Sequence, residues 1–381
     1  MKGNRCVLFE EMIRSFLENE IKPLAEQYGN QENFSNEIKQ KMEKIGLFGL
    51  VIPPEYGGTG ATQREYIYAL EEISKHCATA GMILSAHTSL CAMSILENGT
   101  EEQKKRFLPD LASGQKLGTF GSSELNVEVD ADKQQIAGAE MEDHYLLNGS
   151  KRFNTNVDGA EVFLIIAATD MLSNGSETTA FLVEKGMPGI RVRCCGEEMD
   201  IQDNEAYELI FENVKVPKEN VLGMRGDGLK IAKEMTESGR IGSAALAVGI
   251  AKGTLDTIVA YVKQRKLFGR TLSNFQNTRF QLADMATKIA AARALVYIAA
   301  DAKQNKLPGR SVNAAQAKLL AAEAAVDVAT KAVQIYRGCG DMCNDSIERI
   351  LRDAEIMELY VGTVKRTRMV ISDALMRESD V

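Results

Sequence analysis

The residue pattern of this chain changes twice, near residues 115 and 222, and these changes constrain the fold more than any other feature. Between them lie short segments rich in β-branched and aromatic residues, such as EVFLIIAAT (161–169) and YELIFENVKV (207–216). Turn sequences such as Asn174-Gly175 separate these segments. This spacing predicts an antiparallel sheet or a small barrel rather than alternating strands and helices.

Both flanking regions show helical periodicity. Apolar residues in 3-4-3-4 steps form one stripe on each of two helices near the C-terminus: Leu282, Met285, Ile289, Ala292 and Val296 on the first, and Leu319, Ala322, Val326, Ala329 and Val333 on the second. Such narrow stripes are typical of a helix bundle. We therefore predict an α+β fold with an N-terminal helical domain (1–113), a middle β-sheet or barrel domain (114–224) and a C-terminal four-helix bundle (225–381).

Length and composition restrict the class of protein. A chain of 381 residues exceeds the usual size of one domain. A formal net charge of −8 without a basic block argues against a nucleic-acid partner. The seven scattered cysteines indicate reduced thiols. Cys339 and Cys343 lie close together, but no second Cys pair or nearby His completes a metal site with them. We expect no membrane span and no signal peptide, and hence a cytoplasmic protein.

One segment groups several basic residues. RKLFGRTLSNFQNTRFQLADMA (265–286) begins with Arg265, Lys266 and Arg270 close together. A planar guanidinium can donate two hydrogen bonds at once to a diphosphate. Alternatively, these residues are a solvated charge cluster. Because no GxGxxG follows a predicted strand, a Rossmann nucleotide site is not expected.

Five segments, taken in order, resemble motifs of the acyl-CoA dehydrogenases. They are FGSSELNVEVD (120–130), LNGSKRFNTN (147–156), ESGRIGSAALAVGIAKGTLD (237–256), the segment 265–286, and QIYRGCGDMCNDSIERILRDAEIMELYVGT (334–363). The resemblance extends from about residue 8 to 375. It implies an FAD flavoprotein and oxidoreductase acting on CH–CH groups, commonly a homotetramer. It also implies an acyl thioester substrate and an electron-transferring flavoprotein as the partner.

The resemblance also implies which residues bind FAD. These are Phe120, Ser122, Ser123, Phe153, Thr155, Arg265, Phe268, Leu272, Gln276, Gln334, Gly338 and Thr363. In the family, the residues matching Arg265 and Phe268 contact the FAD of a neighbouring subunit. The chain departs from the family pattern at Val127-Glu128-Val129, where the family has Ala-Gly-Ser close to the FAD pyrophosphate. A glutamate at this place would repel phosphate.

The catalytic base is the main departure from the family. The resemblance places Arg240, Tyr360 and Gly362 at the substrate, with the family's proton-abstracting glutamate between the last two. This chain has Val361 there, and Gly239 at the position that serves as the base in some relatives. Glu237 is a candidate replacement, although a surface ion pair with Arg240, one helical turn away, is the alternative reading.

Three functions follow from these observations. The first is FAD-dependent α,β-dehydrogenation of an acyl thioester, carried on CoA or on an acyl carrier protein. Its base is relocated, to Glu237, Glu358 or the substrate, or is absent. The second is a flavin-dependent oxygenase or oxidase on the same fold. The third is a non-catalytic flavoprotein scaffold.

Overall fold

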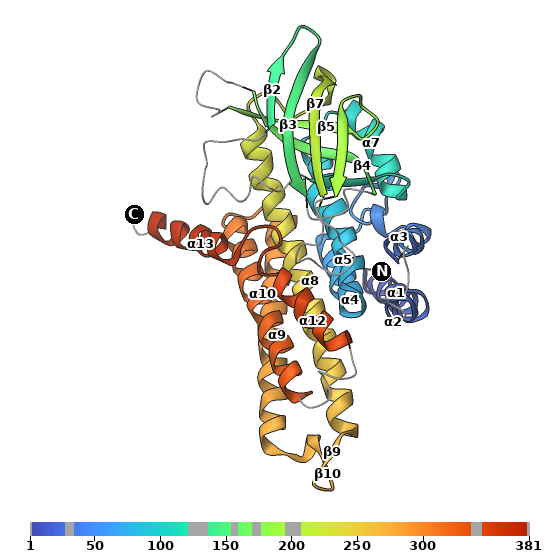
Figure 1. The fold of residues 1–381 in the computed structure, drawn as a ribbon, viewed down its shortest axis with the longest axis vertical. Helices are drawn as coiled ribbons and strands as arrows, with labels where there is room; N and C mark the ends of the chain where they lie inside the picture. Colours follow the sequence, from blue (N-terminus) through green and yellow to red (C-terminus); the bar gives the residue numbers. More distant parts are fainter. Residues whose placement is uncertain are drawn as a thin grey trace. The chain divides into compact units, whose positions relative to one another are not determined.

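The computed structural model describes residues 2–26, 34–120, 136–153, 159–169, 177–194, 207–336 and 345–378. The chain forms two compact units. A helical unit combines residues 1–35, 63–82 and 240–381, and a sheet-containing unit combines residues 36–62 and 83–239. The fold class is confirmed, with helices, a β-sheet and helices in chain order (Figure 1). The boundaries of the three predicted domains stay a prediction.

The helical unit is built mainly from long helices. Its elements are α1 (Lys2–Phe16), η1 (Leu17–Ile21), α2 (Lys22–Glu26), α4 (Gln63–His76), the start of α5 (Ala78–Ser85), most of α8 (Gly228–Gln264), α9 (Gln276–Gln304), α10 (Arg310–Ile335), α12 (Asp345–Ile356) and α13 (Val364–Glu378). Helices α8, α9, α10 and α12 share one hydrophobic cluster that includes Ile258, Leu282, Ala332 and Ile347. This cluster is the core expected of a helix bundle.

The two predicted bundle stripes differ in how well they match the structure. On α9, Met285, Ile289, Ala292 and Val296 are buried as expected. On α10 the buried residues are mainly alanines distributed around the helix, while Val326 and Val333 are only partly buried. The reason is that α10 packs against α9, α12 and α13, so it has no single buried face. Alanine side chains let all three neighbours approach closely.

Two glycines bring α8 against α4. A Cβ atom added to Gly249 would lie 2.3 Å from the carbonyl oxygen of Glu71, and one added to Gly253 would lie 2.2 Å from that of Lys75. No side chain can occupy such spaces without moving the backbone. The buried Glu71 carboxylate between these helices is bound by the Nζ of Lys252 at 2.6 Å and the Nε of Arg293 at 2.7 Å. The close approach at Gly249 and Gly253 fixes α8 against α4, and the buried pairing adds polar contacts.

The sheet-containing unit combines short helices with an eight-stranded sheet. The helices are α3 (Phe34–Lys44), η2 (Leu47–Gly49), η3 (Pro54–Tyr56), η4 (Ala86–Ala92), α6 (Met93–Asn98), α7 (Glu101–Ser113) and η6 (Lys218–Asn220). The strands are β1 (Leu117–Phe120), β2 (Ile136–Glu140), β3 (His144–Phe153), β4 (Ala160–Ala168), β5 (Thr178–Glu184), β6 (Ile190–Cys194), β7 (Tyr207–Pro217) and β8 (Val221–Leu222). Their order is β6-β7-β3-β2-β4-β5-β8, with β1 paired to β4.

The predicted antiparallel pairing of the sheet needs one correction. Strand β4 pairs in parallel with both β1 and β2, so the sheet is mixed. Among the described strands, the two ends of the path, β6 and β8, do not pair with each other to close a barrel. Local residue patterns identify strands, but the direction of pairing depends on long connections, and here the β2–β3 hairpin lies between β1 and β4.

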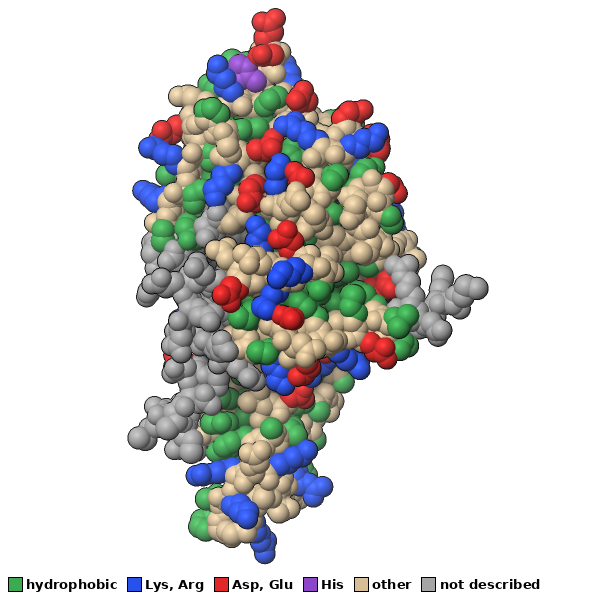
Figure 2. All heavy atoms as spheres, turned by 90° about the vertical axis from the view of Figure 1, so that its right-hand side faces the viewer, with side chains coloured by type: hydrophobic (Ala, Val, Ile, Leu, Met, Phe, Trp, Pro, Cys, Tyr) green, Lys and Arg blue, Asp and Glu red, His purple; other side chains and the backbone are tan. Residues whose placement is uncertain are grey.

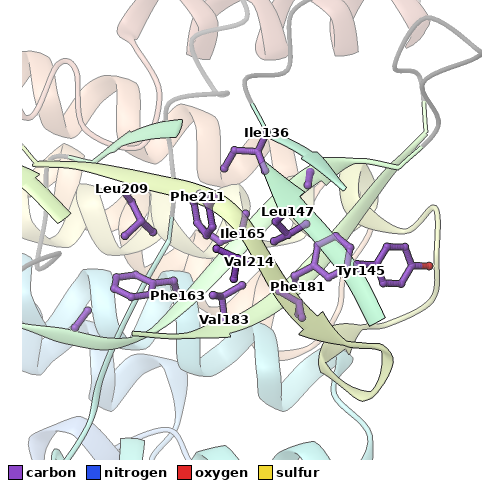
Figure 3. Close-up of a cluster of buried hydrophobic side chains, with 13 residues drawn as sticks. Ile136, Tyr145, Leu147, Phe163, Ile165, Phe181, Val183, Leu209, Phe211 and Val214 are labelled. Atoms are coloured by element: carbon purple, nitrogen blue, oxygen red, sulfur yellow. The ribbon is translucent and has the colours of Figure 1, made fainter. Parts of the chain in front are cut away.

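Aromatic and branched side chains fill the core of the sheet (Figure 3). Phe163, Phe181 and Phe211 are fully buried or nearly so, and the ring of Tyr145 packs edge-on against Phe181 at 5.0 Å. Eight of the nine residues of β4 are buried. A strand covered on both faces needs no polar alternation, which explains the continuous apolar run of EVFLIIAA.

Two helical stretches reach the length and apolarity of a membrane span, contrary to expectation. They are Ala78–Asn98 and Gly228–Gln264, each with a mean hydropathy of 1.4 over its most apolar window. Burial within the protein covers 94% of the first window and 56% of the second. This burial is what core helices of a folded protein show, and we interpret both stretches in that way.

His87 provides a pH-dependent test of the core beside the sheet. Its Nδ1 accepts the backbone N–H of Gly118 at 3.1 Å, so the neutral ring carries its proton on Nε2. Burial lowers the pKa of His87 to about 3. Below about pH 6.5 the unfolded chain therefore binds a proton that the folded chain does not. The contribution of neutral His87 to the free energy of unfolding is fully present above pH 6.5. As the pH falls below 6.5, it decreases by about 1.4 kcal/mol per pH unit until the pKa of the folded state is reached.

We expect His87→Asn to remove this pH dependence, because its side-chain oxygen can still accept the Gly118 N–H. Between pH 7 and pH 5, the free energy of unfolding measured in urea should fall by about 2 kcal/mol more for the unsubstituted protein than for the variant. Equal losses in both proteins would contradict a neutral, buried His87.

Candidate active site

The segment Met357–Thr363 joins α12 to α13 and contains the position of the family's catalytic base. Backbone hydrogen bonds shape it into a compact loop. The N–H of Tyr360 donates to the carbonyl oxygen of Ile356 at 2.9 Å, and the N–H of Val364 donates to the carbonyl oxygen of Glu358 at 3.0 Å. The hydroxyl oxygen of Thr363 accepts the N–H of Arg366 at 3.2 Å. Thr363, predicted to contact FAD, therefore caps the start of α13 as well.

Val361 has an unusual backbone conformation. Its φ is +54°, followed by +97° at Gly362. The left-handed region is uncommon for any residue except glycine, and a β-branched residue there is a clear outlier that costs on the order of 1–3 kcal/mol. The Val361 side chain is only 6% exposed. This position thus holds a buried apolar side chain without a proton acceptor.

The predicted substrate residues lie together. An added Cβ at Gly362 would be 4.0 Å from Nη2 of Arg240, so the guanidinium of this buried arginine lies beside the loop. The Ser243 hydroxyl, one turn further along α8, donates to the carbonyl oxygen of Tyr360 at 3.5 Å. Helix α8 therefore places a cation and a hydroxyl against the same loop.

A buried lysine that sequence reasoning missed also contacts this loop. The Nζ of Lys318, on α10, donates to the carbonyl oxygens of Gly362 at 2.7 Å and Glu358 at 3.1 Å. Burial, together with the positive charge of Arg240, lowers the pKa of Lys318 to about 7, while Glu358 acts in the opposite direction. The available signal was a single charged residue in the alanine-rich stretch AAQAKLLAA, at the spacing of the buried alanines.

Glu237 does not lie on a helix surface as expected. Its side chain and that of Arg240 are 6% and 5% exposed, so both are buried, and the alternative of a surface ion pair is wrong. The error arose because three-residue spacing places two residues on the same side of a helix without saying whether that side faces solvent. The role of Glu237 as a base stays a prediction.

A second group of predicted residues gathers where α8 ends. Strands β9 (Lys266–Leu267) and β10 (Arg270–Thr271) form a small antiparallel hairpin. Its two turn residues, Phe268 and Gly269, both have positive φ, as a tight two-residue hairpin turn requires. The Phe268 side chain is 90% exposed. An exposed aromatic ring in a strained turn is available to an external ligand or a second subunit.

Other predicted cofactor residues lie at the same end of the bundle. Leu272, in η7 (Leu272–Asn274), packs on the bundle core, and its N–H donates to the carbonyl oxygen of Arg265 at 2.9 Å. Gln276 begins α9 and Gln334 is in the last turn of α10, and both are exposed. Nearby, the rings of Tyr261 and Tyr336 stack at 4.0 Å and join the ends of α8 and α10.

This end of the bundle is basic. The stretch 257–283 contains no Asp or Glu. Its exposed cations are Lys263, Arg265, Lys266, Arg270 and Arg279. Figure 2 shows lysine and arginine side chains over the region where Figure 1 places β9 and β10. These residues fit the diphosphate of a dinucleotide, because guanidinium groups without competing carboxylates can bind phosphate oxygens.

The remaining residues predicted to contact FAD lie in or near the sheet, or outside the described ranges. Phe120 is buried at the end of β1, and its backbone pairs with Leu164 of β4. Phe153 ends β3, opposite Tyr207 of β7. Four predicted residues lie outside the described part of the chain, namely Ser122, Ser123, Thr155 and Gly338. In the described ranges, no group of three or more His, Cys, Asp or Glu side chains is arranged to hold a metal ion.

Family models cover almost the entire chain. The acyl-CoA dehydrogenase N-terminal domain matches residues 6–115, the middle domain 119–214 and the C-terminal domain 226–376. The chain belongs to the acyl-CoA dehydrogenase family. Like the family, it is an FAD-dependent oxidoreductase acting on CH–CH groups. The predictions of family, enzyme class and cofactor are thus confirmed.

Three similar proteins are informative. The short-chain specific acyl-CoA dehydrogenase of Clostridium acetobutylicum is 45% identical over 370 residues, which is 97% of each chain. A chain solved in a study of the electron transferring flavoprotein of Acidaminococcus fermentans is 43% identical, with a TM-score of 0.92 and 98% of each chain covered. The prolyl acyl carrier protein oxidase AnaB is 30% identical, with a TM-score of 0.89 and coverage of 97% of this chain and 98% of its own.

Proposed function

We propose that this family member dehydrogenates a short acyl thioester between Cα and Cβ without a carboxylate at either family base position. The observation that carries this proposal is the loop Met357–Thr363, which keeps Arg240 beside Gly362 but has buried Val361 in place of the base. The similarity to a short-chain specific relative supports a short acyl group. FAD, when bound, supplies the hydride acceptor for such chemistry.

The chain must dispose of the substrate's α-proton by another route. Val361 has no atom that can accept a proton. Of the two carboxylates considered, Glu237 is buried on α8, and Glu358 lies in the loop itself, close enough to Lys318 to oppose the lowering of its pKa. A substrate with an unusually acidic α-proton needs no strong base. The proposal therefore has two forms. Either the general base is relocated to Glu237 or Glu358, or the reaction proceeds without a protein base.

The distance between the predicted substrate residues and the predicted FAD residues at the end of α8 supports a homo-oligomer, either a dimer or a tetramer. Arg265 follows Arg240 by 25 residues along and just past α8, which is about 37 Å at 1.5 Å per residue. The predicted substrate residue Arg240 and the predicted FAD residue Arg265 of one chain therefore lie about seven helical turns apart. The proposal is that Arg265 and Phe268 contact the FAD of a neighbouring copy.

The proposed electron acceptor and acyl carrier are supported by similarity to other proteins. An electron-transferring flavoprotein is the proposed electron acceptor, supported by the chain from the Acidaminococcus fermentans study. An acyl carrier protein is an alternative carrier of the acyl group to CoA, and oxidase chemistry is an alternative to electron transfer. Similarity to the prolyl acyl carrier protein oxidase supports both alternatives. A cytoplasmic location stays a prediction.

The decisive experiment is a visible spectrum of the purified protein loaded with FAD, recorded during anaerobic titration with butyryl-CoA. The same acyl group on an acyl carrier protein is titrated in parallel. We expect the oxidised flavin absorbance to decrease with one of the two thioesters, which identifies the carrier. Flavin that neither thioester reduces would contradict the dehydrogenase proposal. Failure to retain any FAD would count against the dehydrogenase proposal as well.

A further inference from the structure

We propose that Lys318 is a positioning residue that holds the loop Met357–Thr363 in the backbone conformation required at position 361. This inference deepens the proposed function, because the loop occupies the place of the family's base. In the described hydrogen bonds, the Lys318 side chain binds main-chain atoms of the loop. Its action therefore does not depend on which side chain stands at 361.

The geometry of the contact is that of a clamp. The two carbonyl oxygens that accept from Nζ belong to Glu358 and Gly362, which lie on either side of Val361. The Ser243 hydroxyl binds the carbonyl oxygen of Tyr360 between them. Two helices thus fix three alternate carbonyls of one short segment. The Glu358 oxygen also accepts the Val364 N–H at 3.0 Å, which ties the clamp to the start of α13.

The conformation held in this way is not one that Val361 would adopt by itself. A positive φ at a β-branched residue persists only where surrounding contacts outweigh its cost. Lys318 is completely buried, and burying an amine is unfavourable unless its donors are satisfied. The bonds to the loop satisfy two of them. Removing Lys318 would also leave the carbonyl oxygens of Glu358 and Gly362 without this donor, so we expect the loop to relax.

The test compares Lys318→Met with Lys252→Met, each in the unsubstituted chain and in the Val361→Glu variant. Methionine keeps much of the length of the lysine stem but removes the donors. Lys252 is a matched control because it is a partly buried lysine of the same unit that bonds Glu71 and Glu72. The readouts are hydrogen exchange of the amides at 359–364, FAD content, and kcat and KM for butyryl-CoA.

We expect Lys318→Met to accelerate amide exchange at 359–364 by at least about tenfold, since it removes two hydrogen bonds that hold the loop backbone. Lys252→Met should leave these amides unchanged. In the Val361→Glu background, Lys318→Met should lower kcat about tenfold with KM changed less than threefold. Lys318→Gln, which retains two amide donors, should recover part of the protection.

Unchanged exchange at 359–364 in Lys318→Met would overturn the proposal, and so would an equal fall in kcat in Lys252→Met. If Lys318→Met does not fold, the exchange measurement on Lys318→Gln decides, with full protection counting against the clamp. The exchange readout needs no turnover. If the unsubstituted protein fails to reduce its flavin, the proposed function falls, but the role of Lys318 is still tested.

Discussion

Val361→Glu will raise the rate at which butyryl-CoA reduces the bound flavin by about 10²- to 10⁴-fold, the usual contribution of a positioned general base. The substitution returns a carboxylate to the family's base position, between Tyr360 and Gly362. The backbone there is already left-handed, and glutamate has no β-branch to strain against it. The measurement is the anaerobic rate of flavin bleaching in a stopped-flow spectrometer.

Val361→Gln is the matched control for this result. It has the size and polarity of glutamate but cannot accept the α-proton at neutral pH. A comparable gain in Val361→Gln would show that a larger or more polar side chain, rather than a base, is responsible. No gain in Val361→Glu would mean that the pocket has been remodelled or that the base lies elsewhere, with Glu237→Gln and Glu358→Gln then the variants to compare.

Arg265→Ala will weaken FAD binding by roughly 100-fold, because two charge-assisted hydrogen bonds to a diphosphate together contribute about 3 kcal/mol. The residue is exposed in a stretch without acidic side chains, beside the outward-facing Phe268. The dissociation constant is measured by titrating the FAD-free protein and following the quenching of flavin fluorescence.

Lys266→Ala separates this assignment from the alternative of a solvated charge cluster. It removes one positive charge from the same hairpin, without removing the planar guanidinium. We expect less than a tenfold effect on FAD affinity. Equal losses for Arg265→Ala and Lys266→Ala would mean that only the net charge of the hairpin matters, and unchanged affinity in both would refute the cofactor assignment.

The sequence predicted the general architecture because that information is local. The β-branched segments between 115 and 222 became strands, and the 3-4-3-4 spacing of Met285, Ile289 and Ala292 became a buried face of α9. The order of five motifs was enough to predict the family. The prediction was weaker for α10, whose alanines contact three helices, since a stripe describes packing against one neighbour only.

The candidate site was predicted residue by residue only where the motif itself carried the chemistry. Arg240 does lie against Gly362, and Arg265, Leu272, Gln276 and Gln334 do lie at one end of the bundle. The burial of Glu237 was not foreseen, because solvent exposure depends on what else packs on α8. Whether either glutamate takes the proton depends on distances to a bound substrate, which no pattern of residues contains.

The sequence by itself therefore determined the fold class, the family, the FAD cofactor and the absence of a glutamate at both 361 and 239. Only the tertiary structure decided that β4 pairs in parallel with β1 and β2, that Val361 is left-handed, and that Lys318 bonds the loop from a different helix. The physical reason is the range of the interactions. Periodicity and motifs reflect contacts within a few residues, whereas Lys318 and Gly362 are 44 residues apart and meet only when the bundle has closed.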